Sequence, residues 1–535
     1  MKKQLIEFID RHNSVEKPLV TEAKLAYWNA SISGKDEDYA KAETLQQECI
    51  KIVTNKSDFE ILKKIKASGE INESLLIRQL DILYNQYLLS KANPEKLKEI
   101  VSLEVQVEKK YSNFRSDING KRYTDNEIEY ILNNSINDNE LKQAWFSHKK
   151  IGNLVADDIQ LLVKKRNEIA VDLGFQNYHE MNLTLGEQNP DDIEKIFDEL
   201  DILTKQAYIK LKNDIDLYLS DRLKINKNEL MPWHYQNRFF QEAPKIYKLD
   251  LDDYYKNKNL EEITKNYYAG LGLKVDELIA QSDLYEKPGK NQHAYCISID
   301  TEGDIRVLCN IKNNSQWMNT MLHEFGHAVY DKYIDRSLPY LLRNPSHTFT
   351  TEAIAMMFGR LGSNPQWLKD ATGISGSEKD KIRDACFKTL RLEQLVFSRW
   401  VQVIYRFEKS MYENTETDLN SLWWSLVEKY QLIKQPVDRD EPDWASKIHI
   451  ATSPCYYHNY LLGELLASQL HYYITMNIIK SQDYTGQSYY NNPDVGNYLI
   501  EKVFKPGASL SWNELIENAT GEKLTSAYYA RQFVE

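Results

Sequence analysis

The sequence predicts a mainly α-helical fold, with two helical lobes around a deep cleft. Only 20 glycines and 14 prolines occur among 535 residues, and few breakers over a long chain favour helices. No internal repeat or low-complexity tract interrupts the chain, and no Pro/Gly/Ser-rich linker divides it. We therefore expect one domain over residues 1–535.

Helical periodicity dominates residues 1–220. In one example, Leu162, Ile169 and Leu173 lie seven and four positions apart, which places them on one face of a helix. Gly174 follows directly, where a helix C-cap is expected.

Residues 292–311 predict a small β-hairpin. Two short apolar runs, at residues 294–299 and 305–311, flank a polar turn that contains Gly303. Helical patterning resumes near Trp317 and continues, with loops, to the end of the sequence. We expect the hairpin to lie next to the helix that follows it.

Charge and cysteine content disfavour several classes of function. The net charge of −12 disfavours nonspecific binding to nucleic acid or to anionic membranes, because both need basic surfaces. The five cysteines are scattered and form no CxxC pair. A cysteine zinc site, a redox motif and a disulfide framework are therefore not expected.

The beginning of the chain predicts its compartment. Glu7 and Asp10 interrupt the apolar stretch after the first two lysines, so the segment does not read as a signal peptide. No stretch reaches the ~18 apolar residues that a membrane span needs. The sequence therefore predicts a cytoplasmic protein, although a mature secreted or periplasmic chain would have the same pattern.

The chain contains a His-Glu-x-x-His motif at residues 323–327. Fewer than ~0.03 matches are expected by chance in a chain of 535 residues with 11 histidines. Residues four apart share a helix face, so His323 and His327 can reach one ion. Glu324 beside them can take a proton from an attacking water. Ser315 is a candidate N-cap for this helix.

A third ligand must come from elsewhere, because catalytic zinc usually has three protein ligands and one open position. Glu352 is the best candidate, since it lies in the apolar segment 349–358, where a carboxylate needs a partner. Two alternatives stay open. Glu352 could be a first-turn acid favoured by the helix dipole, with Thr350 or Thr351 as N-cap, and His347 could be the ligand instead. Two imidazoles and a carboxylate suit zinc, so we expect one Zn²⁺ per chain.

With this motif, the sequence resembles the angiotensin-converting-enzyme family of zinc dipeptidyl carboxypeptidases, which are gluzincins. It is also similar to the related thimet-oligopeptidase and oligoendopeptidase F peptidases. The matching segments are AYWNA at 26–30, RNEIA at 166–170, LGFQNY at 173–178, EKP at 286–288, HA at 293–294, EAI at 352–354 and ATG at 519–521, with Trp512 and Tyr529. The first segment implies an N-terminal helical lid over about residues 1–120 of a single metallopeptidase catalytic domain.

The resemblance implies roles for residues outside the motif. The spacing from His293 to His323 matches that family, in which this histidine binds substrate backbone and the following alanine, here Ala294, lies beside the scissile residue. His449 and Tyr460 would donate hydrogen bonds to the oxyanion, which needs donors aimed at its negative charge.

The resemblance also implies a site for the substrate's free C-terminal carboxylate. Lys447 and Tyr457 would bind it, because an exopeptidase needs a fixed cation there. Gln236, in the segment WHYQ, is a candidate for the glutamine that assists them.

Some positions depart from the family pattern. The gap from His449 to Tyr460 is one residue longer, so Tyr456 is an alternative to Tyr460. Asn459 stands where chloride-activated relatives have an arginine, so chloride activation through that site is not expected. Met356 stands where an acid is usual, so support for a zinc histidine must come from elsewhere.

Together these residues predict a zinc metallopeptidase that hydrolyses short peptides without a covalent intermediate and releases C-terminal dipeptides. Three alternatives remain: an oligoendopeptidase of the thimet or oligoendopeptidase F type, a carboxypeptidase that releases single residues, and a peptide-binding module without catalysis. The presence of Glu324 argues against the last. Peptides are the expected partners, and nucleic acid and membranes are not.

Overall fold

The computed structural model describes residues 1–534, and 70% of it is helical. The described part contains two antiparallel strand pairs, β1–β2 and β3–β4. The predicted mainly α-helical class is therefore confirmed. No helix within residues 1–534 is long and apolar enough to cross a membrane.

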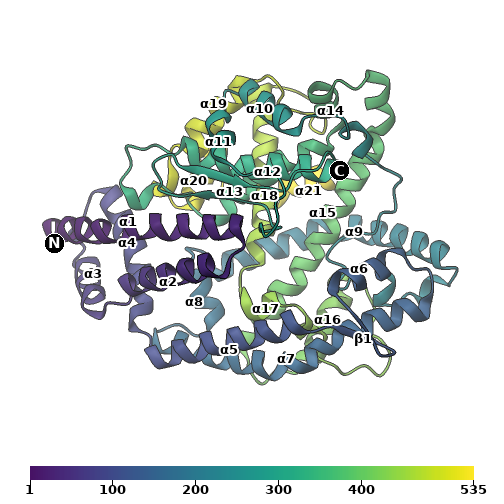
Figure 1. The fold of residues 1–535 in the computed structure, drawn as a ribbon, viewed down its shortest axis with the longest axis horizontal. Coiled ribbons are helices and arrows are strands. Elements are labelled where there is room, and N and C mark those ends of the chain that lie inside the picture. Colours follow the sequence, from purple (N-terminus) through teal and green to yellow (C-terminus); the bar gives the residue numbers. More distant parts are fainter. Residues whose placement is uncertain (535) are drawn as a thin grey trace. The chain divides into compact units, whose positions relative to one another are not determined.

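The chain forms two compact units, and the predicted cleft stays a prediction. Unit 1 comprises Met1–Lys91, Leu249–Cys386 and Leu462–Gln532, and unit 2 consists mainly of Ala92–Lys248 and Phe387–Leu461. Figure 1 labels their helices and strands in chain order. Two of the boundaries between the units fall inside α15 (Gly376–Glu413) and α18 (His458–Tyr473).

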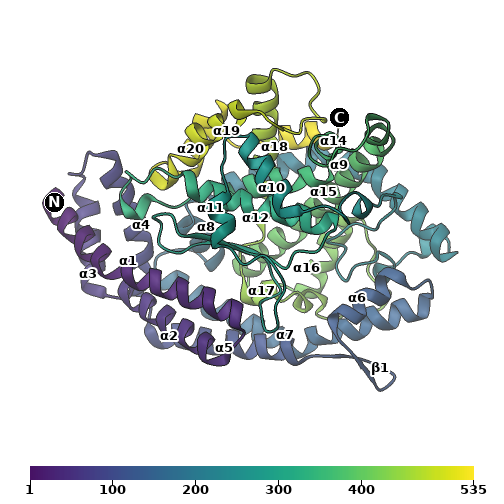
Figure 2. The same ribbon diagram turned by 45° about the horizontal axis from the view of Figure 1, so that its top comes forward.

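Unit 1 holds the predicted hairpin and the motif helix. Its other elements are α1 (Lys2–Ser33), α2 (Asp36–Val53), α3 (Lys56–Ser68), α4 (Ser74–Leu88), α10 (Leu260–Gly270), α11 (Asp276–Gln281), β3 (Tyr295–Ser298), β4 (Ile305–Leu308), α12 (Ser315–Tyr333), α13 (Thr348–Gly359), α14 (Pro365–Thr372), α19 (Pro493–Leu499), α20 (Trp512–Thr520) and most of α21 (Ala527–Phe533). The long helices α1 and α2 lie side by side in both views (Figures 1 and 2).

Unit 2 contains α5 (Pro94–Asn113), β1 (Ser116–Ile118), β2 (Lys121–Tyr123), α6 (Asp125–Asn134), α7 (Asp138–Asp172), α8 (Tyr178–Leu185), α9 (Pro190–Leu223), α16 (Leu419–Leu426) and α17 (His449–Thr452). The strand pair β1–β2 lies inside the region predicted to be helical. Its turn is Asn119-Gly120, with both φ angles positive (55° and 83°), and this dipeptide is the strongest short hairpin signal. The sequence therefore contained a signal for this hairpin.

The predicted β-hairpin at residues 292–311 is confirmed. Cys296 pairs with Val307 in the β3–β4 register, and the turn is closed by Asp300, whose Oδ1 accepts the backbone N–H groups of Glu302, Gly303 and Asp304. Such a side-chain turn offers the backbone its missing partners.

Helix α1 covers this hairpin. The indole of Trp28 meets the Tyr295 ring edge-on, with centroids 6.1 Å apart, and Trp28 is buried with Ile299 and Leu308. Lys24 Nζ donates to the carbonyl of Ser298 at 2.8 Å. Since apolar burial holds α1 on the hairpin, the N-terminal helices and the hairpin form one layer of unit 1.

Helices α12 and α13 approach each other so closely at Gly326 that no side chain fits there. A Cβ at Gly326 would lie 2.9 Å from the Ala355 Cα. Phe325 and Ala328 on α12 and Ile354 on α13 are fully buried around this crossing. A glycine without a Cβ therefore sets the distance between the two helices.

Candidate metal centre

Helix α12 presents the His-Glu-x-x-His motif as predicted. The rings of His323 and His327 lie one turn apart, with centroids separated by 5.0 Å. The N-cap of this helix is Asn314, one residue before the predicted cap, and its side chain accepts a hydrogen bond from the Trp317 N–H at 2.9 Å. The predicted cap, Ser315, is the first helical residue, and its hydroxyl donates to Asp252 instead. A residue with helical φ and ψ cannot cap its own helix.

Helix α13 supplies the third candidate ligand. Its N-cap is His347, whose Nδ1 accepts the Phe349 N–H at 3.2 Å, so the predicted caps Thr350 and Thr351 lie inside the helix. Glu352 is the fifth helical residue, and no acid occupies the first turn. Because the dipole effect fades within the first turn, it does not account for Glu352.

The three predicted ligands converge. Glu352 Oε2 lies 3.8 Å from the Nε2 atoms of both His323 and His327, and one ligand atom of each residue falls within a 4.8 Å cluster. Tetrahedral zinc ligands at about 2.0–2.1 Å from the metal lie roughly 3.4 Å apart. The arrangement therefore fits one zinc-sized ion if the carboxylate and the imidazoles move a few tenths of an ångström closer together. His347, which caps α13, is not part of this cluster.

Burial sets the charge states of these groups. It lowers the pKa of His323 to about 4 and that of His327 to about 3, with the neighbouring His323 as a second cause for His327. Both imidazoles are therefore neutral near pH 7, as a metal ligand must be. Burial raises the pKa of Glu352 to about 7, so its ionised form needs a cation nearby.

Neighbouring residues orient the ligands. His327 Nδ1 and Thr351 Oγ1 form a 2.7 Å hydrogen bond, so Nε2 is the ring nitrogen that faces Glu352. Thr351 thereby orients a candidate zinc-binding histidine by a hydrogen bond, as the acid usual at position 356 would do and Met356 cannot. A Cβ at Gly463 on α18 would lie 3.3 Å from the Glu352 Cβ and 3.2 Å from Met356 Sδ, so α18 packs closely against this part of α13.

Glu324 occupies the position expected of a base. It is 8% exposed, and burial, followed by the charge of Glu352, raises its pKa to about 8. Its carboxylate accepts a hydrogen bond from the backbone N–H of Cys296 on β3. The predicted neighbourhood of hairpin and motif helix is thus confirmed by a direct contact.

His293 and Ala294 lie directly before β3 on the same hairpin. The His293 side chain is exposed, and its backbone N–H donates to Asn291 Oδ1 at 3.0 Å. Ala294 is partly buried. The two residues predicted to bind substrate backbone therefore directly precede the strand that contacts Glu324.

The remaining predicted residues gather in unit 2. Lys447 Nζ lies over the rings of Phe239, Trp400 and Tyr457, 5.2–5.4 Å from their centroids. Burial, followed by the charge of Arg238, lowers the Lys447 pKa to about 7. A cation among aromatic faces is stabilised by their quadrupoles, so the ammonium is held apart from bulk water.

His449, Tyr457 and Tyr460 form a chain of ring contacts. The centroids of His449 and Tyr457 are 5.4 Å apart, as are those of Tyr457 and Tyr460. Burial lowers the His449 pKa to about 4, so the ring is neutral at pH 7 and can donate one N–H. The alternative tyrosine, Tyr456, also contacts the Tyr460 ring at 5.4 Å.

The loop before α18 sets the register of these tyrosines. Cys455 has a left-handed φ of 54°, and its N–H donates to the buried Glu408 at 2.8 Å. Gln188 Nε2 donates to Asn459 Oδ1 at 2.7 Å. Asn459, which stands where chloride-activated relatives have an arginine, is thus hydrogen-bonded to the neutral amide of Gln188.

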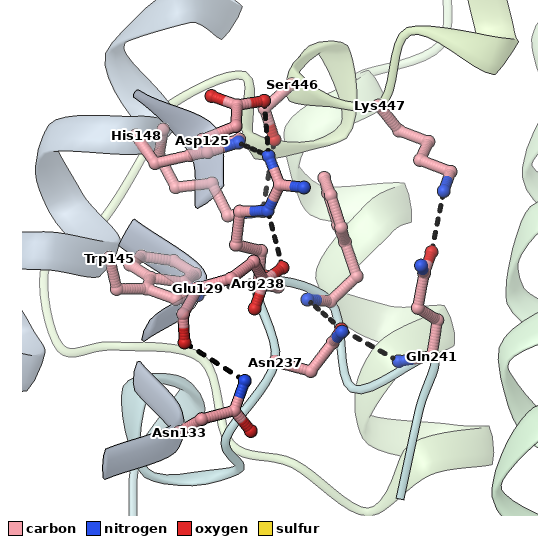
Figure 3. A network of polar contacts seen from close by, with 12 residues as sticks. Asp125, Glu129, Asn133, Trp145, His148, Asn237, Arg238, Gln241, Ser446 and Lys447 are labelled. Carbon is pink, nitrogen blue, oxygen red and sulfur yellow. Dashed lines mark hydrogen bonds and ion pairs between the residues drawn. The ribbon is translucent and has the colours of Figure 1, made fainter. Parts of the chain in front are cut away.

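The structure brings Gln241, rather than Gln236, to Lys447. Gln241 Oε1 accepts a 2.6 Å hydrogen bond from Lys447 Nζ (Figure 3), whereas Gln236 Nε2 donates to the carbonyl of Asn133. Both glutamines lie in one irregular segment. No periodic pattern there could have distinguished them in the sequence.

Comparisons with known proteins agree with the motif. Residues 1–534 match a family model described as angiotensin-converting enzyme, peptidase M2. An angiotensin-converting enzyme of Theromyzon tessulatum is 23% identical over 309 residues, covering 55% of this chain and 50% of that protein. That of Mus musculus is 22% identical over 563 residues, covering 97% of this chain and 41% of that protein. That of Haematobia irritans exigua is 21% identical over 448 residues, covering 77% of this chain and 72% of that protein. The match thus spans about half the length, or less, of the first two relatives.

The predicted cytoplasmic location is wrong. The proteins that this chain matches are angiotensin-converting enzymes and an angiotensin-converting-enzyme-like protein, which are secreted or membrane-anchored extracellular enzymes. The prediction relied on the first residues and on composition. Neither separates a cytoplasmic chain from a mature extracellular one.

Proposed function

This chain belongs to the angiotensin-converting-enzyme family, and on that premise we propose that it is a zinc peptidase that releases dipeptides from the C-terminus of short peptides. Residues 1–535 act as one catalytic domain in this proposal. The observation that carries it is the convergence of His323, His327 and Glu352 beside a buried Glu324.

His323, His327 and Glu352 would hold one Zn²⁺. The donor set suits this ion, because both imidazoles are neutral and the carboxylate is partly buried. Zinc, when bound, supplies a Lewis acid that polarises the scissile carbonyl.

Glu324 is the general base. It takes a proton from the attacking water and delivers it to the leaving amine. Its place next to His323 on the same helix and its burial, with 8% of the residue exposed, support this role, because the carboxyl group is shielded from bulk water. The hydrogen bond from the Cys296 N–H lowers the pKa of the same carboxyl group and so favours its ionised form, which is the form that accepts a proton.

Tyr460 and His449 are the proposed donors to the oxyanion, and His293 and Ala294 the proposed contacts with the substrate backbone. The neutral state of His449 supports its role, since a neutral ring donates one N–H without adding a charge. Donors aimed at developing negative charge each contribute ~10²–10³ in rate.

The free carboxylate of the substrate would bind to Lys447, Tyr457 and Gln241. A fixed cation among aromatic rings supports an exopeptidase, because an endopeptidase has no terminal carboxylate to neutralise. Gln241 takes the place that Gln236 had in the sequence-based hypothesis, because its side chain contacts Lys447.

The test is product analysis on one decapeptide, as a free acid and as a C-terminal amide, with and without a chelator. We expect the free acid to lose dipeptides stepwise and the amide to be cleaved far more slowly. Equal cleavage of both would favour an oligoendopeptidase, and release of single residues would favour a metallocarboxypeptidase.

Glu324→Gln provides the matched control. We expect it to lower kcat by ~10²–10⁴ through loss of proton transfer, while the zinc content, measured by atomic absorption, stays at one per chain. If the wild type hydrolyses peptides no faster than this variant, the chain is a peptide-binding module instead.

A further inference from the structure

The segment that carries Gln241 has a strained backbone. Gln236 and Phe240 both adopt left-handed φ angles, 58° and 51°. Non-glycine residues occupy this region only when their surroundings hold them there. The contacts of this segment therefore decide where Gln241 points.

Asn237 makes the contacts that close the turn. It is 4% exposed, and its Oδ1 accepts the backbone N–H of Phe239 at 2.9 Å and that of Gln241 at 3.2 Å. An asparagine that bonds to the backbone two residues ahead is a recognised turn former. In Figure 3 the side chain of Asn237 lies beside Gln241, and Gln241 in turn meets Lys447.

A second buried amide holds the same turn through its carbonyl groups. Gln431, 1% exposed, donates from Nε2 to the carbonyls of Phe239 and Phe240, both at 3.0 Å. The carbonyl of Gln431 accepts from the Tyr208 hydroxyl at 2.9 Å. The backbone from 239 to 241 is thus fixed through its N–H groups by Asn237 and through its C=O groups by Gln431.

This turn determines which chemical groups the Lys447 site offers. Gln241 Oε1 accepts from the ammonium of Lys447 at 2.6 Å. An amide whose oxygen accepts from an ammonium presents N–H donors to any third partner. An ammonium beside such an amide is complementary to a carboxylate, which only accepts hydrogen bonds when ionised.

We propose that Asn237 is a positioning residue that fixes Gln241 on Lys447 and thereby sets the affinity for the substrate's C-terminal carboxylate. This inference rests on the proposed function. Asn237 acts through Gln241, so its effect falls on substrate binding and not on the chemistry at the metal centre.

The test compares Asn237→Ala with the wild type on the free-acid and amidated decapeptides. We expect KM for the free acid to rise ~10-fold with kcat unchanged, because a misplaced Gln241 weakens ground state and transition state alike. The kinetics on the amide should stay the same, since it lacks the carboxylate. Asn237→Asp, which keeps the accepting oxygen, should restore KM to within about 3-fold.

Asn93→Ala is the matched control. Asn93 accepts one backbone N–H at the start of α5, so this variant loses the same kind of bond without touching the 236–241 segment, and it should leave both substrates unaffected. If Asn237→Ala does not fold, Asn237→Ser, with a shorter acceptor, takes its place in the same comparison.

Two results would overturn this inference without affecting the proposed function. In the first, Asn237→Ala loses activity equally on the free acid and on the amide, which indicates a general structural role. In the second, Asn237→Ala keeps the wild-type preference for the free acid. A wild type that does not distinguish the free acid from the amide would instead refute the proposed exopeptidase function, and the inference with it.

Discussion

The Lys447 ammonium combines a strongly altered pKa with a proposed role in binding. Its pKa is lowered to about 7: burial is the largest cause, the charge of Arg238 acts in the same direction, and the charges of Glu242 and Glu129 act in the opposite direction. His449, two residues away, is neutral near pH 7 and does not compete for an anion. The charge of Lys447 therefore changes within the range in which the protein can be assayed.

This pKa predicts how substrate affinity depends on pH. Lys447 is charged below about pH 7 and neutral above it, so carboxylate binding should be strong at low pH and weaken as pH rises. We expect the KM ratio of free-acid to amidated peptide to rise ~10-fold between about pH 7 and pH 8.5, following the charged fraction. Steady-state kinetics on both peptides measure it, and the ratio cancels titrations at the metal centre.

Lys447→Arg is the control for this prediction, because arginine stays protonated across this range. The ratio should then be flat with pH. A wild-type ratio that does not change over the same interval would contradict a titrating Lys447 as the carboxylate-binding cation.

Among the elements, the crossing of α12 and α13 determines the metal centre. The helices approach so closely at Gly326 that a Cβ would lie 2.9 Å from the Ala355 Cα and 3.3 Å from its N. These are backbone atoms of a helix, which cannot move aside as a flexible side chain can. The distance between the histidines of one helix and the glutamate of the other follows from this contact.

Gly326→Ala should therefore lower both stability and zinc affinity. Alanine in a helix normally stabilises it by about 0.5–1 kcal/mol relative to glycine, but overpacking costs about 1–3 kcal/mol, so the net effect is destabilising. Urea unfolding and zinc titration measure the two effects. In contrast, Gly376→Ala in α15 has open space around its Cβ and should be neutral or stabilising. A Gly326→Ala variant as stable as Gly376→Ala would show that the helices are not in this tight contact.

In the whole molecule, the metal ligands would link α12 and α13 within unit 1. Zinc that binds the folded state alone stabilises it by about 2.7 kcal/mol at 100 times its Kd. We expect chelation to lower amide-exchange protection in α12 and α13, whereas α7 in unit 2 keeps its protection. Hydrogen exchange with mass spectrometry measures both regions.

Glu352→Gln provides the reference for this experiment. With one ligand removed, the variant should respond much less to the chelator than the wild type does. Equal protection of α12 and α13 with and without chelator in the wild-type protein would argue against a metal held by these two helices.

Local sequence patterns predicted a large part of the fold and of the site. The helical class, the β3–β4 hairpin and the shared face of His323 and His327 depend on periodicity within a few residues, which the sequence contains directly. The helix caps were less predictable. Asn314 and His347 cap α12 and α13 in place of the predicted Ser315 and the two threonines, because several neighbouring polar residues could serve and element boundaries vary by one or two residues.

The sequence alone determined the motif, the class of fold and Glu352 as the best third ligand. Only the tertiary structure decided that Glu352 lies 3.8 Å from both imidazoles, that Thr351 orients His327, and that Gln241 rather than Gln236 contacts Lys447. The physical reason is that these contacts join residues from separate elements or from irregular backbone. Their distances depend on how helices pack and turns close, which no local periodicity encodes.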